Sequence, residues 1–196
     1  MTRQKWVATG LVASLLLFAL PALAAAEAKF LLEKQVFLPS CGLKQPLTVD
    51  FDGSGDKPVF AETKPIASER AALVLAWGGP DGDALALQLL NSTTYVCYKT
   101  RLRDEVHEEL VVLGLGRERG ISVELKEIAV LGAQEDGTIG LLPLVGFAPV
   151  DYYNAPLQQN TKRQILFPLS ANSGKAPALL FWEPAKQAVR FAASNT

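Results

Sequence analysis

Apolar side chains alternate with polar ones along much of the chain, and this alternation limits the fold more than any other feature of the sequence. A clear example is residues 121–125, in which Ile, Val and Leu alternate with Ser and Glu. Successive side chains of a β-strand point to opposite faces of a sheet, so a run of this kind buries one face and leaves the other in water. The pattern therefore predicts β-strands that each have one buried face.

Turn-forming residues separate these apolar runs. They include Gly-Gly-Pro-Asp-Gly at 78–82, the segment from Gly114 to Gly120, and Asp136-Gly137. Their spacing, roughly ten to twenty residues, predicts consecutive antiparallel strands in an all-β, single-domain β-sandwich or irregular barrel. The predicted strands are 34–38, 46–51, 71–77, 84–90, 93–102, 108–113, 121–131, 139–146, 163–169, 178–182 and 187–192.

A helix is an alternative at two places. Ser68 can cap a helix that continues through Glu69, Arg70 and Ala71. The Ala, Leu and Gln content of 84–90 is also compatible with a helix. At both places the surrounding strand pattern favours a strand.

The N-terminus has the pattern of a secretory signal peptide. Arg3 and Lys5 precede an uncharged apolar run over 7–20, and small residues follow, with cleavage expected near Ala24 or Ala26. The apolar run is too short to cross roughly 30 Å of hydrocarbon comfortably. We therefore expect residues 1–26 to be removed and 27–196 to form one β-rich domain, in the periplasm or outside the cell.

Charge and hydropathy exclude two classes of partner. Cleavage would remove two of the 19 Lys+Arg, which leaves 17 against 20 Asp+Glu and a formal net charge of −3. An acidic chain of this kind is not expected to bind nucleic acid or an anionic membrane face. No second apolar stretch reaches the roughly 18 residues of a membrane helix, so no transmembrane anchor is expected in the mature chain.

The chain has two cysteines, Cys41 and Cys97. In an exported protein the default state of such a pair is a disulfide. Two cysteines and one histidine do not make a zinc site, which needs four ligands, and the spacing is not that of a CxxC redox pair. We expect a structural disulfide.

The segment Asp50-Phe51-Asp52-Gly53-Ser54-Gly55-Asp56 resembles the start of the calcium loops found in EF-hands and in several extracellular calcium-binding repeats. In those loops oxygens at positions one, three and five converge on the cation, and a glycine at position six allows the sharp turn. The resemblance implies calcium ligands at Asp50, Asp52 and Ser54, with Asp56 supplying its carbonyl.

The match to a calcium loop is incomplete. The bidentate acid expected at position twelve is Ala61, and the nearest carboxylate, Glu62, comes one residue late. We therefore expect at most weak calcium binding and no other cofactor. The alternative is an acidic, glycine-rich turn at the end of a strand.

The most irregular stretch runs from Pro143 to Lys162 and contains three prolines, paired tyrosines and a cluster of amides. Long loops of this composition often carry binding residues. We take Tyr152, Tyr153 and Asn154 as the candidate binding loop.

No residue pattern indicates catalysis. His107 is the sole histidine and lies in an acidic run, Asp104 to Glu109, which is typical of a solvated charged turn. No nucleophile elbow, metalloprotease helix or phosphate-binding loop is present. Catalytic residues are therefore not assigned.

Lys99, Arg101 and Arg103 alternate with uncharged residues and would share one face of a strand. Such a basic stripe can dock an anionic partner, but it is more often a solvated face balanced by nearby acids.

These features predict an exported β-sandwich binding or accessory protein that recognises a protein or another envelope component. The alternative is an extracytoplasmic hydrolase, or a hydrolase inhibitor, whose acidic residues come together only on folding. Binding is favoured because export and strand patterning are clear while chemistry is not.

The predicted disulfide can be tested directly. Titration of the mature protein, denatured but not reduced, should find no free thiol, because the Cys41–Cys97 bridge occupies both. Reduction should lower the free energy of unfolding by about 4 kcal/mol on the chain-entropy model. Two reactive thiols per chain before reduction would contradict the bridge.

Overall fold

The computed structural model describes residues 29–31, 34–37, 47–67, 70–77, 84–87, 92, 94–153, 155–169 and 176–193. These residues form β-strands joined by turns, with a single short 3-10 helix in the described part, η2 (Pro184–Lys186). The expectation of an all-β fold built from antiparallel sheets is confirmed. The predicted signal peptide, Cys41 and Asn154 lie outside the described residues.

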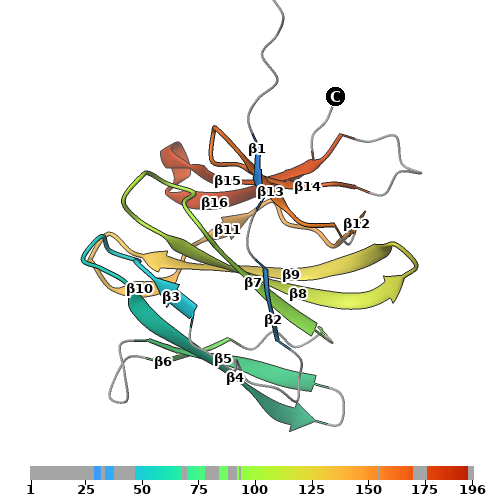
Figure 1. Cartoon of the computed structure of the whole chain (residues 1–196), viewed down its shortest axis with the longest axis horizontal. Coiled ribbons are helices and arrows are strands. Elements are labelled where there is room, and N and C mark those ends of the chain that lie inside the picture. The colour runs from blue at the N-terminus through green and yellow to red at the C-terminus, as the bar shows by residue number, and fades with distance from the viewer. Residues whose placement is uncertain are drawn as a thin grey trace, which may run out of the picture.

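The strands form three sheets, which lie one above another in Figure 1. The top sheet has the order β1 (Lys29–Leu31), β13 (Gln158–Asn160), β14 (Ile165–Phe167), β15 (Ala178–Glu183), β16 (Ala188–Ala193) and β11 (Leu144–Val145). The middle sheet has the order β10 (Ile139–Leu141), β9 (Ser122–Ala133), β8 (Glu109–Arg119), β7 (Thr94–Thr100) and β2 (Lys34–Phe37), and β12 (Val150–Tyr153) also pairs with β9. The bottom sheet has the order β3 (Leu47–Val49), β4 (Lys57–Ala67), β5 (Arg70–Trp77) and β6 (Ala84–Leu87).

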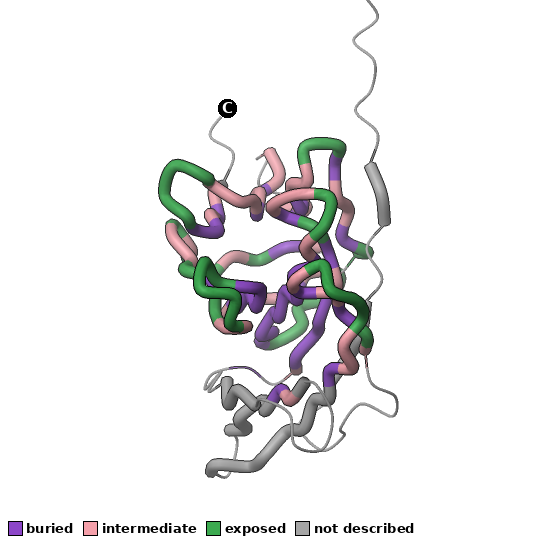
Figure 2. The backbone as a smooth tube through the Cα atoms, turned by 90° about the vertical axis from the view of Figure 1, so that its left-hand side faces the viewer, coloured by how far each residue is buried: buried purple, intermediate pink, exposed green. Residues whose placement is uncertain are grey.

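The middle sheet is buried on both faces. The first eight residues of β8 are all buried, and their side chains alternate between two cores. Val111 and Leu113 join the core shared with the top sheet, whereas Leu110 and Val112 join the core shared with the bottom sheet. Figure 2 shows the buried residues, in purple, gathered in the centre of the described part of the chain. The sequence of a strand that is buried on both faces is a nearly continuous run of apolar residues. Leu110 to Leu113 form such a run.

Aromatic side chains fill the core between the middle and top sheets. Tyr152 meets Phe167 edge-on, with ring centroids 5.6 Å apart, and Phe167 meets Phe191 in the same way at 5.5 Å. Phe147 adds a third edge-on contact, 5.4 Å from Phe191. Edge-to-face pairs are favourable beyond the area they bury, so this cluster joins β12, β14 and β16.

Strand β4 was not expected from the sequence, because Pro58 and Pro65 argue against a strand in the middle of a sheet. The register explains how both are accommodated. Among the described residues, β3 pairs with β4 over residues 57–59 and β5 pairs from Val59 onwards, so each proline has a described partner strand on one side only. A register irregularity follows Pro65.

The strand predicted over 139–146 is wrong as a single element. It divides into β10, in the middle sheet, and β11, in the top sheet, with Leu142 and Pro143 between them. The Pro143 carbonyl accepts a 2.8 Å hydrogen bond from Val189 N and so begins the parallel pairing of β11 with β16. The chain thus crosses from one sheet to the next at Pro143.

The glycines at 114 and 116 do not form the expected hairpin loop. β8 continues through both and turns at Gly120, which has a left-handed φ of 64°. Gly114 is required by a close approach, because a Cβ there would lie 2.2 Å from Ser92 Oγ. That hydroxyl donates a 2.9 Å hydrogen bond to Glu127.

The described parts of both helix alternatives form strands, while Ser68, Glu69 and residues 88–90 lie outside the described residues. Residues 70–77 form β5 and residues 84–87 form β6, and these two strands pair with each other. Within the part of the chain that the structure describes, no helix is long and apolar enough to span a membrane.

Candidate functional site

The predicted binding loop divides between the core and the surface. Tyr152 is 1% exposed and packs in the aromatic core, where burial raises the pKa of its hydroxyl to about 12. Tyr153 is half-buried and its N–H donates a 2.8 Å hydrogen bond to Pro168 O. The structure therefore gives Tyr152 a packing role and leaves Tyr153 at the surface.

Tyr153 lines a pocket of about 390 Å³ whose wall is mostly apolar. Its other lining residues are Ala155, Pro156, Gln158, Leu166, Pro168, Leu169 and Pro177. Tyr153 therefore connects the predicted binding loop with this pocket. The pocket wall, however, has few polar groups that could select a ligand.

The predicted calcium loop forms a tight turn whose oxygens already have protein partners. Asp50 Oδ1 accepts a hydrogen bond from Gly55 N at 3.0 Å. Asp52 Oδ1 accepts from the amide and hydroxyl of Ser54, and Asp52 Oδ2 lies 2.5 Å from Lys57 Nζ. These contacts with Lys57 and Ser54 hold the pKa of Asp52 well below its usual range. Asp56 is exposed.

Among the described residues, no group of three His, Cys, Asp or Glu side chains gathers closely enough to hold a metal ion. A calcium ion at this loop would have to displace Lys57 from Asp52. Calcium binding here stays a prediction, and Lys57 is the residue that opposes it.

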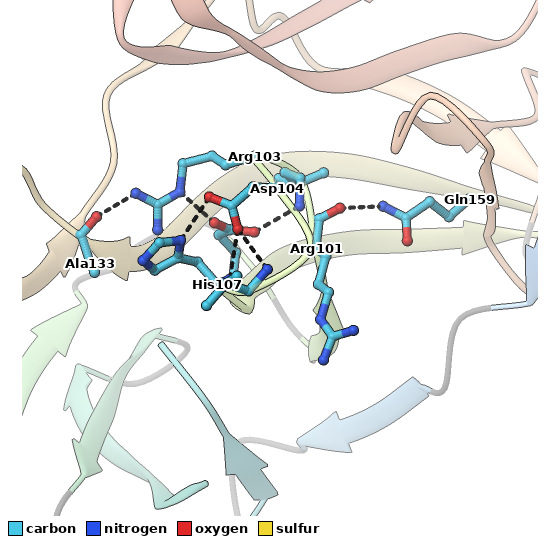
Figure 3. A network of polar contacts seen from close by, with 9 residues as sticks. Arg101, Arg103, Asp104, His107, Ala133 and Gln159 are labelled. Atoms are coloured by element: carbon cyan, nitrogen blue, oxygen red, sulfur yellow. Dashed lines mark hydrogen bonds and ion pairs between the residues drawn. The ribbon is translucent and has the colours of Figure 1, made fainter. Parts of the chain in front are cut away.

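His107 belongs to a capped turn rather than to a cleft. Its Nδ1 lies 2.7 Å from Asp104 Oδ2, and Asp104 Oδ1 accepts from the backbone amides of Val106 and His107 (Figure 3). Burial opposes ionisation of Asp104, but the hydrogen bonds from His107 and Val106 outweigh it and lower the pKa to about 2. These hydrogen bonds give the side chains of His107 and Asp104 a structural role in the turn.

The basic stripe is partly neutralised by the acidic run that follows it. Glu108, which is buried, lies 3.4 Å from Lys99 and 3.3 Å from Arg101, and it also accepts from Asp50 N. One carboxylate serves two cations here, so Lys99 and Arg101 together keep part of their positive charge.

The third cation of the stripe, Arg103, makes a different kind of pair. Its Nε donates to Glu109 Oε1 at 2.5 Å, and Glu109 has no exposed surface. Burial raises the pKa of the Glu109 carboxyl, while hydrogen bonds from Leu102 N and Arg103 oppose that shift. The pair fixes the guanidinium at the start of β8.

Arg103 is held by two further contacts. Its Nη1 donates a 2.6 Å hydrogen bond to Ala133 O at the end of β9 (Figure 3), and its Cζ lies 5.7 Å from the ring centroid of Trp182 on β15. A guanidinium at this distance from an indole ring is attracted to it. The remaining nitrogen, Nη2, is buried and has no hydrogen-bond partner among the described residues.

Arg103 is one of the residues that line a pocket of about 550 Å³ between the middle and top sheets. The β9–β10 turn supplies Gln134, Glu135 and Asp136, and the crossing between β10 and β11 supplies Leu141, Leu142 and Pro143. Trp182 on β15 and Lys186 and Gln187 at the end of η2 complete the wall, with Ala133 beside Arg103. We call this cavity the Arg103 pocket.

The Arg103 pocket combines an aromatic wall with donors and acceptors. Lys186 pairs with Glu183 at 3.4 Å, and Gln187 adopts a left-handed φ of 47° in which its side-chain amide donates to Pro184 O. A concave site with an aromatic face and a few placed polar groups is the usual form of a ligand-binding site. We take it as the candidate functional site.

Sequence reasoning did not find this pocket. Arg103 was noted as part of the basic stripe, and Trp182 was noted only as the end of a predicted strand. The signal that could have drawn attention to the region was Pro143, because a proline inside a predicted strand marks a break. Nothing in the sequence indicates that the break lies beside Arg103.

The fold and the Arg103 pocket define an all-β protein of stacked antiparallel sheets with a cavity of mixed polar and apolar lining between two of them. No protein-family model matches the chain, and neither the curated proteins nor the solved structures gave a match.

The buried pair between Glu109 and Arg103 should stabilise the fold strongly. Glu109→Ala leaves a buried cation without its counter-charge and should lower the free energy of unfolding by about 3–5 kcal/mol in a urea titration. The matched control is Glu105→Ala, which removes an exposed partner of Arg163 and should cost about 1 kcal/mol or less. Equal losses in the two variants would show that the buried pair does not have this role.

Calcium should bind weakly at the Asp50–Asp56 loop and more strongly once Lys57 is removed. With a dissociation constant near 10⁻³ M, about 10 mM calcium would stabilise the native state by about 1.4 kcal/mol and raise the melting temperature. Lys57→Met should enlarge this rise because Asp52 Oδ2 loses its competing cation.

Asp52→Ala is the control and should abolish the effect of calcium on the melting temperature. Melts of the wild type and of Lys57→Met that are both indifferent to calcium would leave the loop as an acidic turn.

Proposed function

We propose that this chain is an exported β-sandwich binding protein that recognises a protein or another component of the cell envelope through the Arg103 pocket. The observation that supports this most directly is the pocket itself, a concave site lined by Trp182 and by the polar side chains of Arg103 and Glu135. Concave sites with an aromatic wall and a few polar groups are the usual form of ligand-binding sites.

The pocket is arranged in advance of binding. Hydrogen bonds to Glu109 and to the Ala133 carbonyl fix the Arg103 guanidinium, and the ring of Trp182 lies against it. Because the side chain is already fixed, a ligand would not have to order it, which reduces the entropic cost of association.

Export rests on the N-terminal segment. Basic residues, a short apolar run and an alanine-rich end precede the β-rich part of the chain, which supports a periplasmic or secreted location. The predicted Cys41–Cys97 bridge belongs to the same proposal, because disulfides persist in oxidising compartments. Cys97 itself is fully buried in the core between the middle and bottom sheets.

The alternative, a hydrolase with paired carboxylates, fits the pocket less well. Such enzymes place one carboxyl group on each side of the bond to be cleaved. Glu135 and Asp136 are exposed neighbours on the single β9–β10 turn and so approach the pocket from one side. Glu109 is engaged by Leu102 N and by Arg103.

Capture from the native envelope fraction tests the binding proposal. The immobilised protein should retain an envelope component, and Trp182→Ala and Glu135→Lys should each reduce the amount retained, since both alter the pocket wall. Glu118→Lys is the matched charge reversal: it lies on an exposed part of β8 near the opposite end of β9 and should retain as much as the wild type.

Each variant's melting temperature establishes that it is folded. Equal retention by the wild type and both folded pocket variants would assign the captured component to another surface and overturn the proposal.

A further inference from the structure

We infer that the outer face of the top sheet and the pocket beside Tyr153 together bind a long-chain carboxylate, a single alkyl chain with an anionic head. This site lies on the opposite face of the top sheet from the Arg103 pocket, and it goes beyond the function proposed for that pocket. Three properties support it: an apolar surface that continues into the pocket, the few hydrogen-bonding groups along that surface, and a net positive charge at its far end.

The outer face of the top sheet carries a row of apolar side chains. Ile165 on β14 and Leu180 on β15 are buried in the core between the middle and top sheets. Side chains alternate along a strand, so Leu166, Leu179 and Phe181 point to the other face. We call these three residues the outer strip. All are half-buried, and no described strand packs on this face, which is the outermost layer in Figure 1.

The outer strip continues into the pocket of about 390 Å³ that Tyr153 lines. Leu166 belongs to both, and it is the register partner of Leu179. Pro177, another lining residue, takes the outward position before Leu179. The distance along the chain from Pro177 to Phe181 is about 13 Å. The pocket and the strip therefore form one elongated apolar surface, which fits an extended alkyl chain.

This surface offers a ligand few hydrogen bonds. β14 pairs with β13 and β15, and β15 pairs with β14 and β16, so the backbone groups beneath the strip are used within the sheet. The pocket lining includes three prolines, which have no N–H, and no charged side chain. A peptide or a sugar bound here would leave polar groups of its own without partners, which is unfavourable. An alkyl chain has no such groups.

The far end of the outer strip carries a net positive charge. Phe181 is the register partner of Arg190, whose Nη1 lies 3.3 Å from the Glu183 carboxylate. The same carboxylate lies 3.4 Å from Lys186 Nζ, so one anion serves two cations. The side chain of Arg190 is 42% exposed. An anionic head at this end of the strip would be attracted, and its chain would extend toward the pocket.

Titration calorimetry with octanoate, decanoate and dodecanoate, at pH 8 and below their micelle concentrations, tests the alkyl site. Each further CH₂ that is buried should tighten binding by up to about fourfold. Decanoate should bind about threefold to fivefold more tightly than decanol at low salt, because only the carboxylate is attracted by Arg190. High salt should reduce this preference.

Two further probes represent other ligand classes. One is the acidic apolar peptide acetyl-Leu-Leu-Val-Glu, and the other is a vesicle of phosphatidylglycerol and phosphatidylcholine. We expect the peptide to bind more weakly than dodecanoate, because its backbone would lie on a surface with few hydrogen-bonding groups. We expect no attachment to the vesicles, because the site takes one chain.

Leu179→Gln tests the outer strip. It keeps a side chain of similar size but places a polar amide on the strip, and it should weaken dodecanoate binding about fivefold or more. The matched control is Ile121→Gln, which changes an apolar side chain that is 69% exposed between β8 and β9 and should leave the affinity unchanged. Melting temperatures establish that both variants are folded.

Arg190→Gln tests the positive end. It leaves Glu183 with Lys186 alone, so the excess positive charge is lost. The preference for decanoate over decanol should fall to about one, while decanol binds as it does to the wild type. Arg163→Gln is the matched control, because Arg163 pairs with Glu105 and does not line the pocket.

Several results would overturn the inference. They are binding that does not depend on chain length, tighter binding of the peptide than of dodecanoate, and attachment to vesicles without binding of monomeric dodecanoate. Wild-type affinity for dodecanoate in a folded Leu179→Gln variant would also do so, as would an unchanged preference for decanoate in Arg190→Gln. Glu135→Lys alters only the Arg103 pocket and should leave dodecanoate binding unchanged, so this test is separate from envelope capture.

Discussion

The burial of both faces of the middle sheet is the constraint on which the rest of the structure depends. Val111 and Leu113 must be covered from above and Leu110 and Val112 from below, and these residues alternate along one strand. Removing either outer sheet would expose a continuous apolar surface, which is unfavourable in water. The connections between sheets are therefore as important as the sheets, and the pocket forms at one of them, where the chain passes from β10 to β11.

The polar interactions at this crossing join neighbouring strands and also fix the position of a side chain that lines the Arg103 pocket. Arg103 follows β7, Glu109 begins β8 and Ala133 ends β9, so one guanidinium ties three neighbouring segments of the middle sheet to each other. Trp182 brings in the top sheet. A charge at this position would be costly if it were isolated, but the carboxylate, the carbonyl and the indole offset its loss of water. The remaining nitrogen, Nη2, is buried over Gly132 and belongs to the packing.

The sequence predicted those strands whose own residues alternate in polarity or form an apolar run. The alternation around Val123 and Leu125 gave β9 almost as the structure has it, whereas the apolar run before Gly114 gave only the first part of β8, over residues 109–113. β4 was not predicted, because it contains two prolines. The structure accommodates them because each partner strand pairs with only part of β4. The candidate site could not be predicted, because Arg103, Ala133 and Trp182 are distant in sequence and only the packing of two sheets brings them together.

The outer side of β9 carries two short strands, with β12 paired to residues 122–125 and β10 to residues 131–133. An exposed, continuous strand edge is a template for pairing with a second chain and hence for aggregation. Here the two partners are separate segments that leave for the top sheet, so the edge is interrupted at both ends. Pairing of another chain with this side of β9 is therefore limited to the residues between 125 and 131, a stretch much shorter than the strand.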